Sequence, residues 1–360
     1  MKFEPDPIGH ASSFRSEEIQ FLHLLAKRAF QSVHMNPVLT NLNTARRQDR
    51  PSHLRVGSLT FHLPNPENHR VSPGNVECLG CRKARYQQVR FSGSGDMIAT
   101  CLEGFLEFCS DANESPHIIV LNELSISYQS KDIILRKLKT IAQEHQIYIV
   151  AGSYHDTQTY YNIAPIIGPD GRSEEIYKHL SAHVQGERIR TPDAKEINIV
   201  SSDYGNFIVW ICFDMYDPAL ILKFLNASNR FTWGDPENGK RRKDLDFVLV
   251  PSFNSDSPES IIKNLKLISK FSKVALFCSN SFGQRMESFA FLGGHSIDSA
   301  LSWACDDDPG RGKLCQAELF CLERSRLDEV QAADFLEDGT FSAQFSAVIK
   351  GDYAVRNIPK

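Results

Sequence analysis

The sequence predicts an α/β protein in which helices cover layers of β-sheet. Short apolar strands alternate with amphipathic helices through most of the 360 residues. Three of the apolar segments also end in a side chain that can carry chemistry. The length allows one large α/β domain or two ordinary ones, and a hydrophobic content of 41% is enough for a substantial core.

Residues 1–53 differ from the rest of the chain, and we interpret them as an N-terminal helix and linker. Ser16 and the two glutamates after it are typical of a helix start, and apolar residues then recur at helical spacing as far as Val33. Residues 40–52 show no periodicity. The domain is predicted to span 54–330, with an insertion at about 64–94 and a C-terminal tail at 331–360.

Within the domain, apolar patterning predicts strands and helices in alternation. The predicted strands are 54–63, 86–91 inside the insertion, 117–121, 147–152, 161–167, 207–213, 247–251 and 274–279. The predicted helices are 97–109, 131–145, 218–226 and 260–271.

Composition and charge favour a protein that acts on a small molecule. The formal net charge is -4 and the pI is about 6.3, which does not suggest binding to nucleic acid. No apolar run approaches the roughly 20 residues that span a bilayer, and the first ten residues do not resemble a secretory signal. Nine cysteines, an odd number, indicate reduced thiols. We therefore expect a cytoplasmic protein without a membrane or nucleic-acid partner.

Three segments place a reactive side chain at the end of an apolar strand. The first ends in Glu123, at a sheet edge of the kind that holds ligands in α/β proteins. The second holds Lys178, with Glu187 shortly after it. The third is the most specific: a strand ends in Cys212, where a thiol can face a pocket while backbone N–H groups point at a developing oxyanion. Each of the three alone also has an ordinary explanation: a glutamate that caps a strand end, a lysine on the surface and a cysteine packed in the core.

In this order, Glu123, Lys178 and Cys212 resemble the nitrilase superfamily. The surrounding matches are Lys178-His179-Leu180, Gly186-Glu187, Cys212-Phe213-Asp214 with Pro218, Asp246 to Asn254, Ser279-Asn280 with Gly283, and Gly293-Gly294-His295-Ser296. The resemblance covers residues 54 to about 330 and implies a four-layer α-β-β-α sandwich. It also implies a homo-oligomer, dimer or larger, with residues 216–224 as the expected contact. We expect the strands that lead to Glu123 and Cys212 to lie in one sheet.

The resemblance implies cysteine-dependent hydrolysis of a non-peptide carbon–nitrogen bond, of amide or carbamoyl type, through a thioester on Cys212. Glu123 would be the general base, and Lys178 would stabilise the tetrahedral oxyanion. Glu187 would orient Lys178 or the substrate. The remaining candidates for oxyanion or substrate contacts are Phe213, through its backbone N–H, Tyr216 and Asn254. No cofactor is expected, and the substrate is expected to be a small amide or ureido compound.

Departures from the family pattern narrow the range of reactions and substrates that the resemblance implies. Relatives that hydrolyse nitriles have Cys-Trp-Glu, whereas the chain has Cys212-Phe213-Asp214, which is closer to the amidase and carbamoylase branches. Tyr216 stands where the branch acting on N-carbamoyl amino acids has an arginine. Acyl transfer to another amine stays open. The alternative reading is a catalytically silent module that binds a ligand or partner, suggested by the N-terminal segment and the insertion.

Cys78 and Cys81 have the spacing of a zinc-ribbon pair, but no second pair exists to complete four ligands. The only conceivable completions are His69, Cys305 and Cys315. We therefore expect no metal site.

Overall fold

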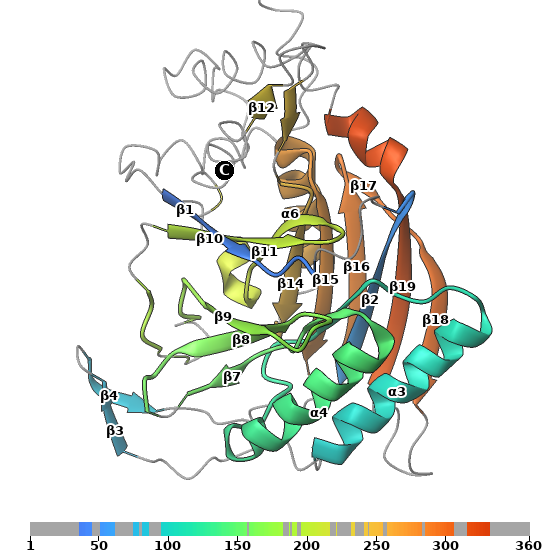
Figure 1. Cartoon of the computed structure of the whole chain (residues 1–360). Coiled ribbons are helices and arrows are strands. Elements are labelled where there is room, and N and C mark those ends of the chain that lie inside the picture. Colours follow the sequence, from blue (N-terminus) through green and yellow to red (C-terminus); the bar gives the residue numbers. More distant parts are fainter. Residues whose placement is uncertain are drawn as a thin grey trace, which may run out of the picture.

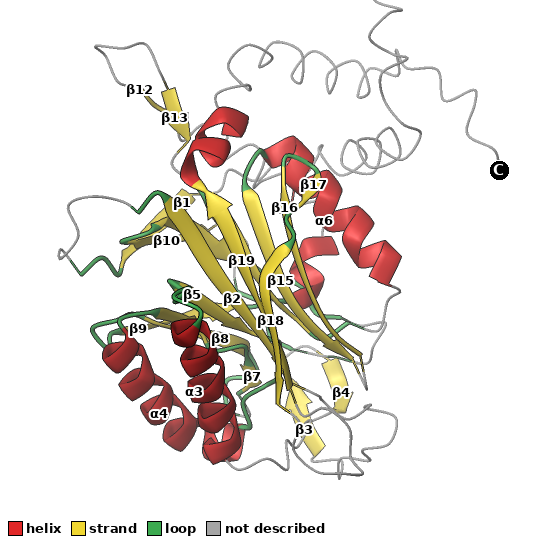
Figure 2. Cartoon of the chain, turned by 90° about the vertical axis from the view of Figure 1, so that its right-hand side faces the viewer, coloured by secondary structure: helices red, strands yellow, loops and turns green. Residues whose placement is uncertain are grey.

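Two mixed β-sheets pack face to face and carry helices on their outer faces, as the computed structural model shows (Figures 1 and 2). The structure describes residues 36–44, 51–61, 75–78, 81–85, 95–156, 158–182, 187, 189–192, 196–216, 221, 232–234, 241–243, 245–254, 258–282, 285–305 and 315–331. The predicted four-layer α-β-β-α sandwich is confirmed. None of the described helices is long and apolar enough to cross a membrane.

The first sheet has eight strands and carries α3 (Gly95–Asp111) and α4 (Lys131–His145) on its outer face (Figure 2). Its strands, in spatial order, are β18 (Ser299–Cys305), β19 (Cys315–Glu323), β2 (His53–Phe61), β5 (Ile118–Leu121), β6 (Tyr148–Val150), β8 (Asn162–Ile167) and β7 (Tyr154–His155), with β9 (Ser173–Tyr177) also paired to β8. The helix predicted at 131–145 is confirmed at both ends, and its apolar stripe is buried against the sheet.

The second sheet has seven strands and carries α6 (Pro258–Ser272) on its outer face (Figure 2). Its strands, in spatial order, are β1 (Asn36–Asn41), β10 (Glu196–Ser202), β11 (Gly205–Val209), β14 (Phe247–Ser252), β15 (Ala275–Phe282), β16 (Arg285–Leu292) and β17 (His295–Ser296). Outside the two large sheets lie the hairpins β3 (Asn75–Cys78) with β4 (Cys81–Arg85) and β12 (Thr232–Gly234) with β13 (Arg241–Lys243).

Alternating side chains on the strands build the three apolar cores of the sandwich, one between the sheets and one under the helices on each side. On β5, Ile118 and Val120 point between the two sheets, whereas Ile119 and Leu121 point toward α3 and α4. Strand β11 follows the same rule, since Phe207 lies between the sheets and its neighbour Ile208 packs under α6.

The expectation that the strands leading to Glu123 and Cys212 share a sheet is wrong. β5 belongs to the eight-stranded sheet and β11 to the seven-stranded sheet. Both strands contribute to the core between the sheets, so the residues after them meet across that layer rather than along one edge. The strand predicted at 207–213 is also shorter, because it ends at Val209 and a 3-10 turn, η4 (Cys212–Tyr216), follows.

Part of the range 1–53 belongs to the sandwich. Residues 36–41 form β1, which pairs in parallel with β10 at the edge of the seven-stranded sheet (Figure 1). Leu42, in the range predicted to be linker, has an exposed fraction of 1%. The predicted helix after Ser16, the strand at 86–91 and, except for Ile221, the helix at 218–226 lie outside the described residues.

Candidate active site

A buried ammonium group between two carboxylates forms the centre of the site. Lys178 Nζ lies 2.8 Å from Glu123 Oε1 and 2.7 Å from Glu187 Oε2, and 1% of the Lys178 side chain is exposed. A lysine is almost never buried this fully without a charged partner. The structure therefore brings Lys178 together with Glu123 and Glu187, and the thiol of Cys212, the fourth residue predicted to be catalytic, lies next to Glu123.

The Glu123 carboxylate is fixed on both of its oxygens. Oε1 accepts a second hydrogen bond, from Asn162 Nδ2 at 2.8 Å, in addition to that from Lys178. Oε2 accepts from the backbone N–H of Phe253 at 3.1 Å. Because Asn162 lies on β8 and Phe253 follows β14, both sheets contribute to holding this carboxylate.

Glu187 has contacts of its own that hold it beside the ammonium. Its Oε2 accepts from the backbone N–H of Ala182 at 2.7 Å. Its Oε1 lies 3.0 Å from His155 Nε2 and accepts from Asn162 Nδ2 at 3.2 Å. Asn162 thus donates to both carboxylates and fixes their separation around Lys178.

The charges in this cluster stabilise one another in their ionised forms. Burial would lower the pKa of Lys178, but Glu123 and Glu187 hold this pKa well above its usual value. Burial would raise the pKa of Glu187, but the Lys178 ammonium and the hydrogen bond with His155 hold it below its usual range. Lys178 is therefore a permanent cation, as stabilisation of an oxyanion requires.

Cys212 lies at a sharp bend between β11 and η4. Its φ angle is 47°, in the left-handed region that residues other than glycine rarely adopt. The thiol is fully buried, and its Sγ donates to the carbonyl oxygen of Phe253 at 3.4 Å. Burial and the nearby Glu123 carboxylate raise the pKa of Cys212 well above its usual value, although Lys178 opposes them. The thiol is therefore protonated at neutral pH and needs a base to become a nucleophile.

The backbone of Phe253 contacts both Glu123 and Cys212. Its N–H donates to the carboxylate and its C=O accepts from the thiol. One residue after β14 thus fixes the base from one sheet beside the thiol from the other.

Asp214 is a site residue to which the sequence assigned no role. It is completely buried, and its Oδ1 accepts from the backbone N–H groups of His179 at 3.0 Å and Leu180 at 2.8 Å. Its Oδ2 accepts from Ile211 N–H at 3.1 Å. Burial raises the pKa of Asp214 to about 7, while Lys178 and these backbone donors favour its ionised form. Asp214 therefore ties the segment after Lys178 to the bend that carries Cys212.

The other predicted contact residues lie close in sequence to this cluster. Phe213 and Tyr216 lie on η4, with ring centroids 5.5 Å apart. Asn254 is buried next to Phe253, and its N–H donates to Asn280 Oδ1 at 3.1 Å. Sequence reasoning missed Asn162 and His155, which show no signal of their own, and Asp214, which stands inside the Cys-Phe-Asp match.

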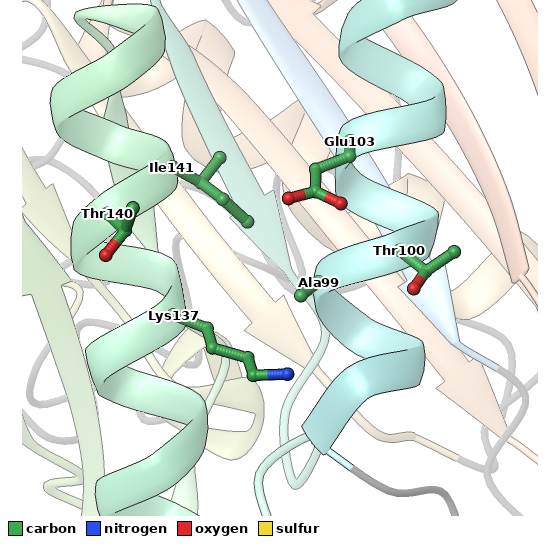
Figure 3. A pocket seen from close by; sticks show the side chains of 6 residues that line it. All are labelled: Ala99, Thr100, Glu103, Lys137, Thr140 and Ile141. Atoms are coloured by element: carbon green, nitrogen blue, oxygen red, sulfur yellow. The ribbon is translucent and has the colours of Figure 1, made fainter.

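A groove on the outer face of the eight-stranded sheet lies apart from this cluster. It runs between α3 and α4, and its lining residues are Ala99, Thr100, Glu103, Lys137, Thr140 and Ile141 (Figure 3). It carries one acidic and one basic side chain and no nucleophile other than threonine hydroxyl groups, so we do not assign it a catalytic role.

Comparisons with solved structures identify the fold. An amidase from Nesterenkonia sp. aligns with a TM-score of 0.51 at 13% identity, covering 81% of this chain and 98% of the amidase. Nit3 from Saccharomyces cerevisiae, a member of branch 10 of the nitrilase superfamily, aligns with a TM-score of 0.52 at 14% identity, covering 78% and 94%. The chain has the nitrilase-superfamily fold.

A third structure is a variant of the Nesterenkonia sp. AN1 amidase. It aligns with a TM-score of 0.51 at 12% identity, covering 80% of this chain and 97% of the amidase. It carries the acetamide moiety of fluoroacetamide covalently attached at the active site cysteine. No protein-family model matches the sequence, and no curated protein matches it either. At these identities the likeness to nitrilase-superfamily structures establishes the fold alone.

Proposed function

We propose that the chain is a cysteine-dependent hydrolase of the nitrilase superfamily that cleaves a non-peptide carbon–nitrogen bond, with Glu123, Lys178 and Cys212 as its catalytic residues. The observation that carries the proposal is the buried ion pair of Lys178 with Glu123, beside a thiol at a strained bend. Buried charges are costly for stability, and strained backbone persists where function requires it.

In the first half of the reaction, the Cys212 sulfur attacks the substrate carbonyl carbon while Glu123 takes the thiol proton. Lys178 and the backbone N–H of Phe213 stabilise the negative charge that develops on the carbonyl oxygen. Protonated Glu123 then gives its proton to the leaving nitrogen, the carbon–nitrogen bond breaks, and an amine or ammonia departs from a thioester on Cys212.

In the second half, Glu123 takes a proton from a water molecule, which attacks the thioester. The carboxylic acid product leaves, and the proton returns to Cys212. Glu187, held by Ala182 and His155, keeps the Lys178 ammonium in place through both halves. Asp214 positions the Cys212 bend against the segment after Lys178.

We propose a small amide or ureido compound as substrate. Cys212 is fully buried and Lys178 is 1% exposed, so the substrate has to fit within an enclosed site. The acetamide moiety attached at the active site cysteine of a Nesterenkonia amidase variant supports a small amide as substrate in this fold. Assembly as a homo-oligomer stays a prediction, and most of the expected contact at 216–224 lies outside the described residues.

Fluoroacetamide separates an active enzyme from a catalytically silent module. It is both an amide and a weak alkylating agent: attack of a thiolate on its carbonyl carbon releases ammonia and forms a thioester, whereas attack on its methylene carbon displaces fluoride and leaves the acetamide moiety on sulfur. We expect intact-mass spectrometry and peptide mapping to find a single adduct, at Cys212, in the wild-type protein. Glu123→Gln should slow the release of ammonia from fluoroacetamide by a factor on the order of 100 to 10,000, the usual contribution of a general base.

Cys321, a half-buried cysteine on β19, is the internal control for ordinary thiol reactivity. Labelling of Cys212 that is no faster than that of Cys321 would favour the silent module. Release of ammonia from an amide and ureido library should then be lost in Cys212→Ala. Turnover that survives this substitution would exclude Cys212 as the nucleophile.

A further inference from the structure

Three cysteine thiols lie together at a place in the fold that the proposed reaction does not use. The sulfur atoms of Cys101, Cys305 and Cys315 all lie within 4.8 Å of one another. Cys101 is on α3, Cys305 ends β18 and Cys315 begins β19. The sequence offered Cys305 and Cys315 only as conceivable completions of a zinc site at Cys78 and Cys81, and it gave no indication of Cys101.

The secondary structure aims all three thiols at one point. Cys305 and Cys315 are directly opposite each other in the antiparallel register of β18 and β19, so their side chains share a face of the sheet. That face is the one covered by α3, since Leu301 and Trp303 on the same side of β18 also pack against the helix layer.

The helix approaches this sheet edge closely near the cluster. A Cβ on Gly104, one turn after Cys101, would lie 3.1 Å from the Trp303 ring, so a larger residue there would push the helix away from β18. Phe105 continues the contact, with its ring centroid 6.2 Å from that of Trp303. The position of Cys101 over the two strands is therefore set by the packing around it.

The three thiols together have the chemistry of a soft-metal site. Thiolates select Zn²⁺ and Cu⁺ over hard cations, and sulfur atoms at this separation can bind one ion. A bound cation would stabilise the thiolate forms of all three side chains. Cys305 is half-buried, which gives an ion a route to the site.

We propose that Cys101, Cys305 and Cys315 bind a single thiophilic d10 metal ion, Zn²⁺ or Cu⁺, that cross-links α3 to the edge of the eight-stranded sheet. Binding releases the three thiol protons to solvent, and no electron is transferred. Three thiolates complete a trigonal Cu⁺ site. Zn²⁺ takes a fourth ligand, which is water in a site with three protein donors. Among the described residues, these three form the only such group of His, Cys, Asp and Glu side chains.

The test uses full-length, reduced, metal-free protein in which Cys212→Ala removes the active-site thiol. Zn²⁺ and Cu⁺ are titrated separately against a competing chromophoric chelator, and the midpoint of thermal unfolding is measured with and without each ion. We expect one equivalent of at least one ion to bind and to raise the midpoint, because a ligand that binds only the folded state stabilises it.

Cys305→Ser is the decisive variant, since its half-buried position carries little risk for folding. It should weaken binding of that equivalent by a factor of about 10 or more and reduce the thermal shift correspondingly. Cys321→Ser is the matched control, because it is also half-buried and lies six residues beyond Cys315 on β19, about 20 Å along the strand. It should bind like the parent protein.

The proposal is overturned if neither ion binds stoichiometrically, or if Cys305→Ser binds as tightly as Cys321→Ser. It is also overturned if protein isolated without reductant contains a Cys305–Cys315 disulfide and the reduced form takes up no metal, since the cluster would then be a redox pair.

Discussion

At the scale of single residues, Lys178 is expected to contribute both to the stability of the buried site and to the proposed catalysis. Its ammonium group forms ion pairs with two carboxylates that would otherwise face each other in a buried environment. The sequence predicted Glu123, Lys178 and Cys212 because each ends an apolar segment in a familiar order. It could not predict Asn162 or the backbone of Phe253, whose contacts with Glu123 depend on how β8 and β14 are placed in space.

Lys178→Met removes the proposed oxyanion donor, and we expect kcat on an identified amide to fall by a factor on the order of 100 to 1,000. The geometry predicts in addition a loss of about 3–5 kcal/mol in the free energy of unfolding, because Glu123 and Glu187 are left buried without a cation. Steady-state kinetics and urea unfolding measure the two effects.

The double substitution of Lys178→Met with Glu123→Gln serves as the control. It removes one of the two stranded charges, so it should recover part of the lost stability while turnover stays absent. A single Lys178→Met variant as stable as wild type would contradict the buried ion-pair geometry, and near-normal turnover would contradict the proposed role.

The lowered pKa of Glu187 predicts how the free energy of unfolding depends on acidic pH. Burial disfavours its charge, yet Lys178 and His155 hold its pKa below the usual value of 4.5. Its contribution to stability is therefore fully present above about pH 4.5 and is lost as the pH falls through the lowered pKa of the folded state. We expect the free energy of unfolding to fall less steeply with acid in Glu187→Gln than in wild type, as measured by urea unfolding from pH 7 to pH 3. Parallel curves would show that Glu187 is not coupled to Lys178.

At the scale of elements, the loop after β5 packs against the segment after β6. Leu124 has a φ of 59°, and its N–H donates to Ser153 Oγ at 3.1 Å. Gly152 has a φ of 67° and leaves no room for a side chain, since a Cβ there would overlap Ser125 Oγ and the carbonyl oxygen of Asn122. Patterning predicted the two strands, but not that Gly152 sets the position of Glu123.

Gly152→Ala should lower the midpoint of thermal unfolding and reduce kcat/KM. The positive φ alone costs about 1–3 kcal/mol, and relief of the overlap would shift the Asn122 carbonyl and the adjacent Glu123. Gly171→Ala is a matched control, because Gly171 has a φ of 81° but its Cβ would meet only the flexible Gln143 side chain. It should lose stability without losing activity. Equal effects of the two substitutions on kcat/KM would contradict the role of Gly152.

At the scale of the whole molecule, the sequence predicted the layers but not which strands face each other. Helix α4 was predicted at both ends because its apolar period is local. β1 was not predicted, because what makes it a strand is its pairing with β10, 160 residues later in the chain. The same limit explains the wrong expectation for β5 and β11, since a strand's own residues do not reveal whether its neighbour lies beside it or across the core.

The last residues before the expected domain start are attached to the sandwich at several points. Leu42 is buried, and its carbonyl oxygen accepts from the Tyr148 hydroxyl at 3.0 Å. Thr44 donates to Asp203 through both its N–H and its hydroxyl, at 3.0 Å and 2.7 Å. Arg172 Nη2 donates to the carbonyl oxygen of Asn43 at 2.8 Å. These contacts place residues 36–44 inside the folded unit.

Two truncations test where the folded unit begins. Removing residues 1–35 deletes none of these contacts, whereas removing 1–44 deletes β1 and exposes the edge of β10. Loss of the buried Leu42 side chain alone should cost about 1.5–3 kcal/mol, and the unpaired strand edge should promote aggregation. We therefore expect a lower midpoint of thermal unfolding and a larger apparent mass in light scattering for the longer truncation, measured against the shorter one. If both truncated proteins unfold at the same temperature and show the same apparent mass in light scattering, β1 contributes nothing to the stability of the sandwich and the domain begins at β2.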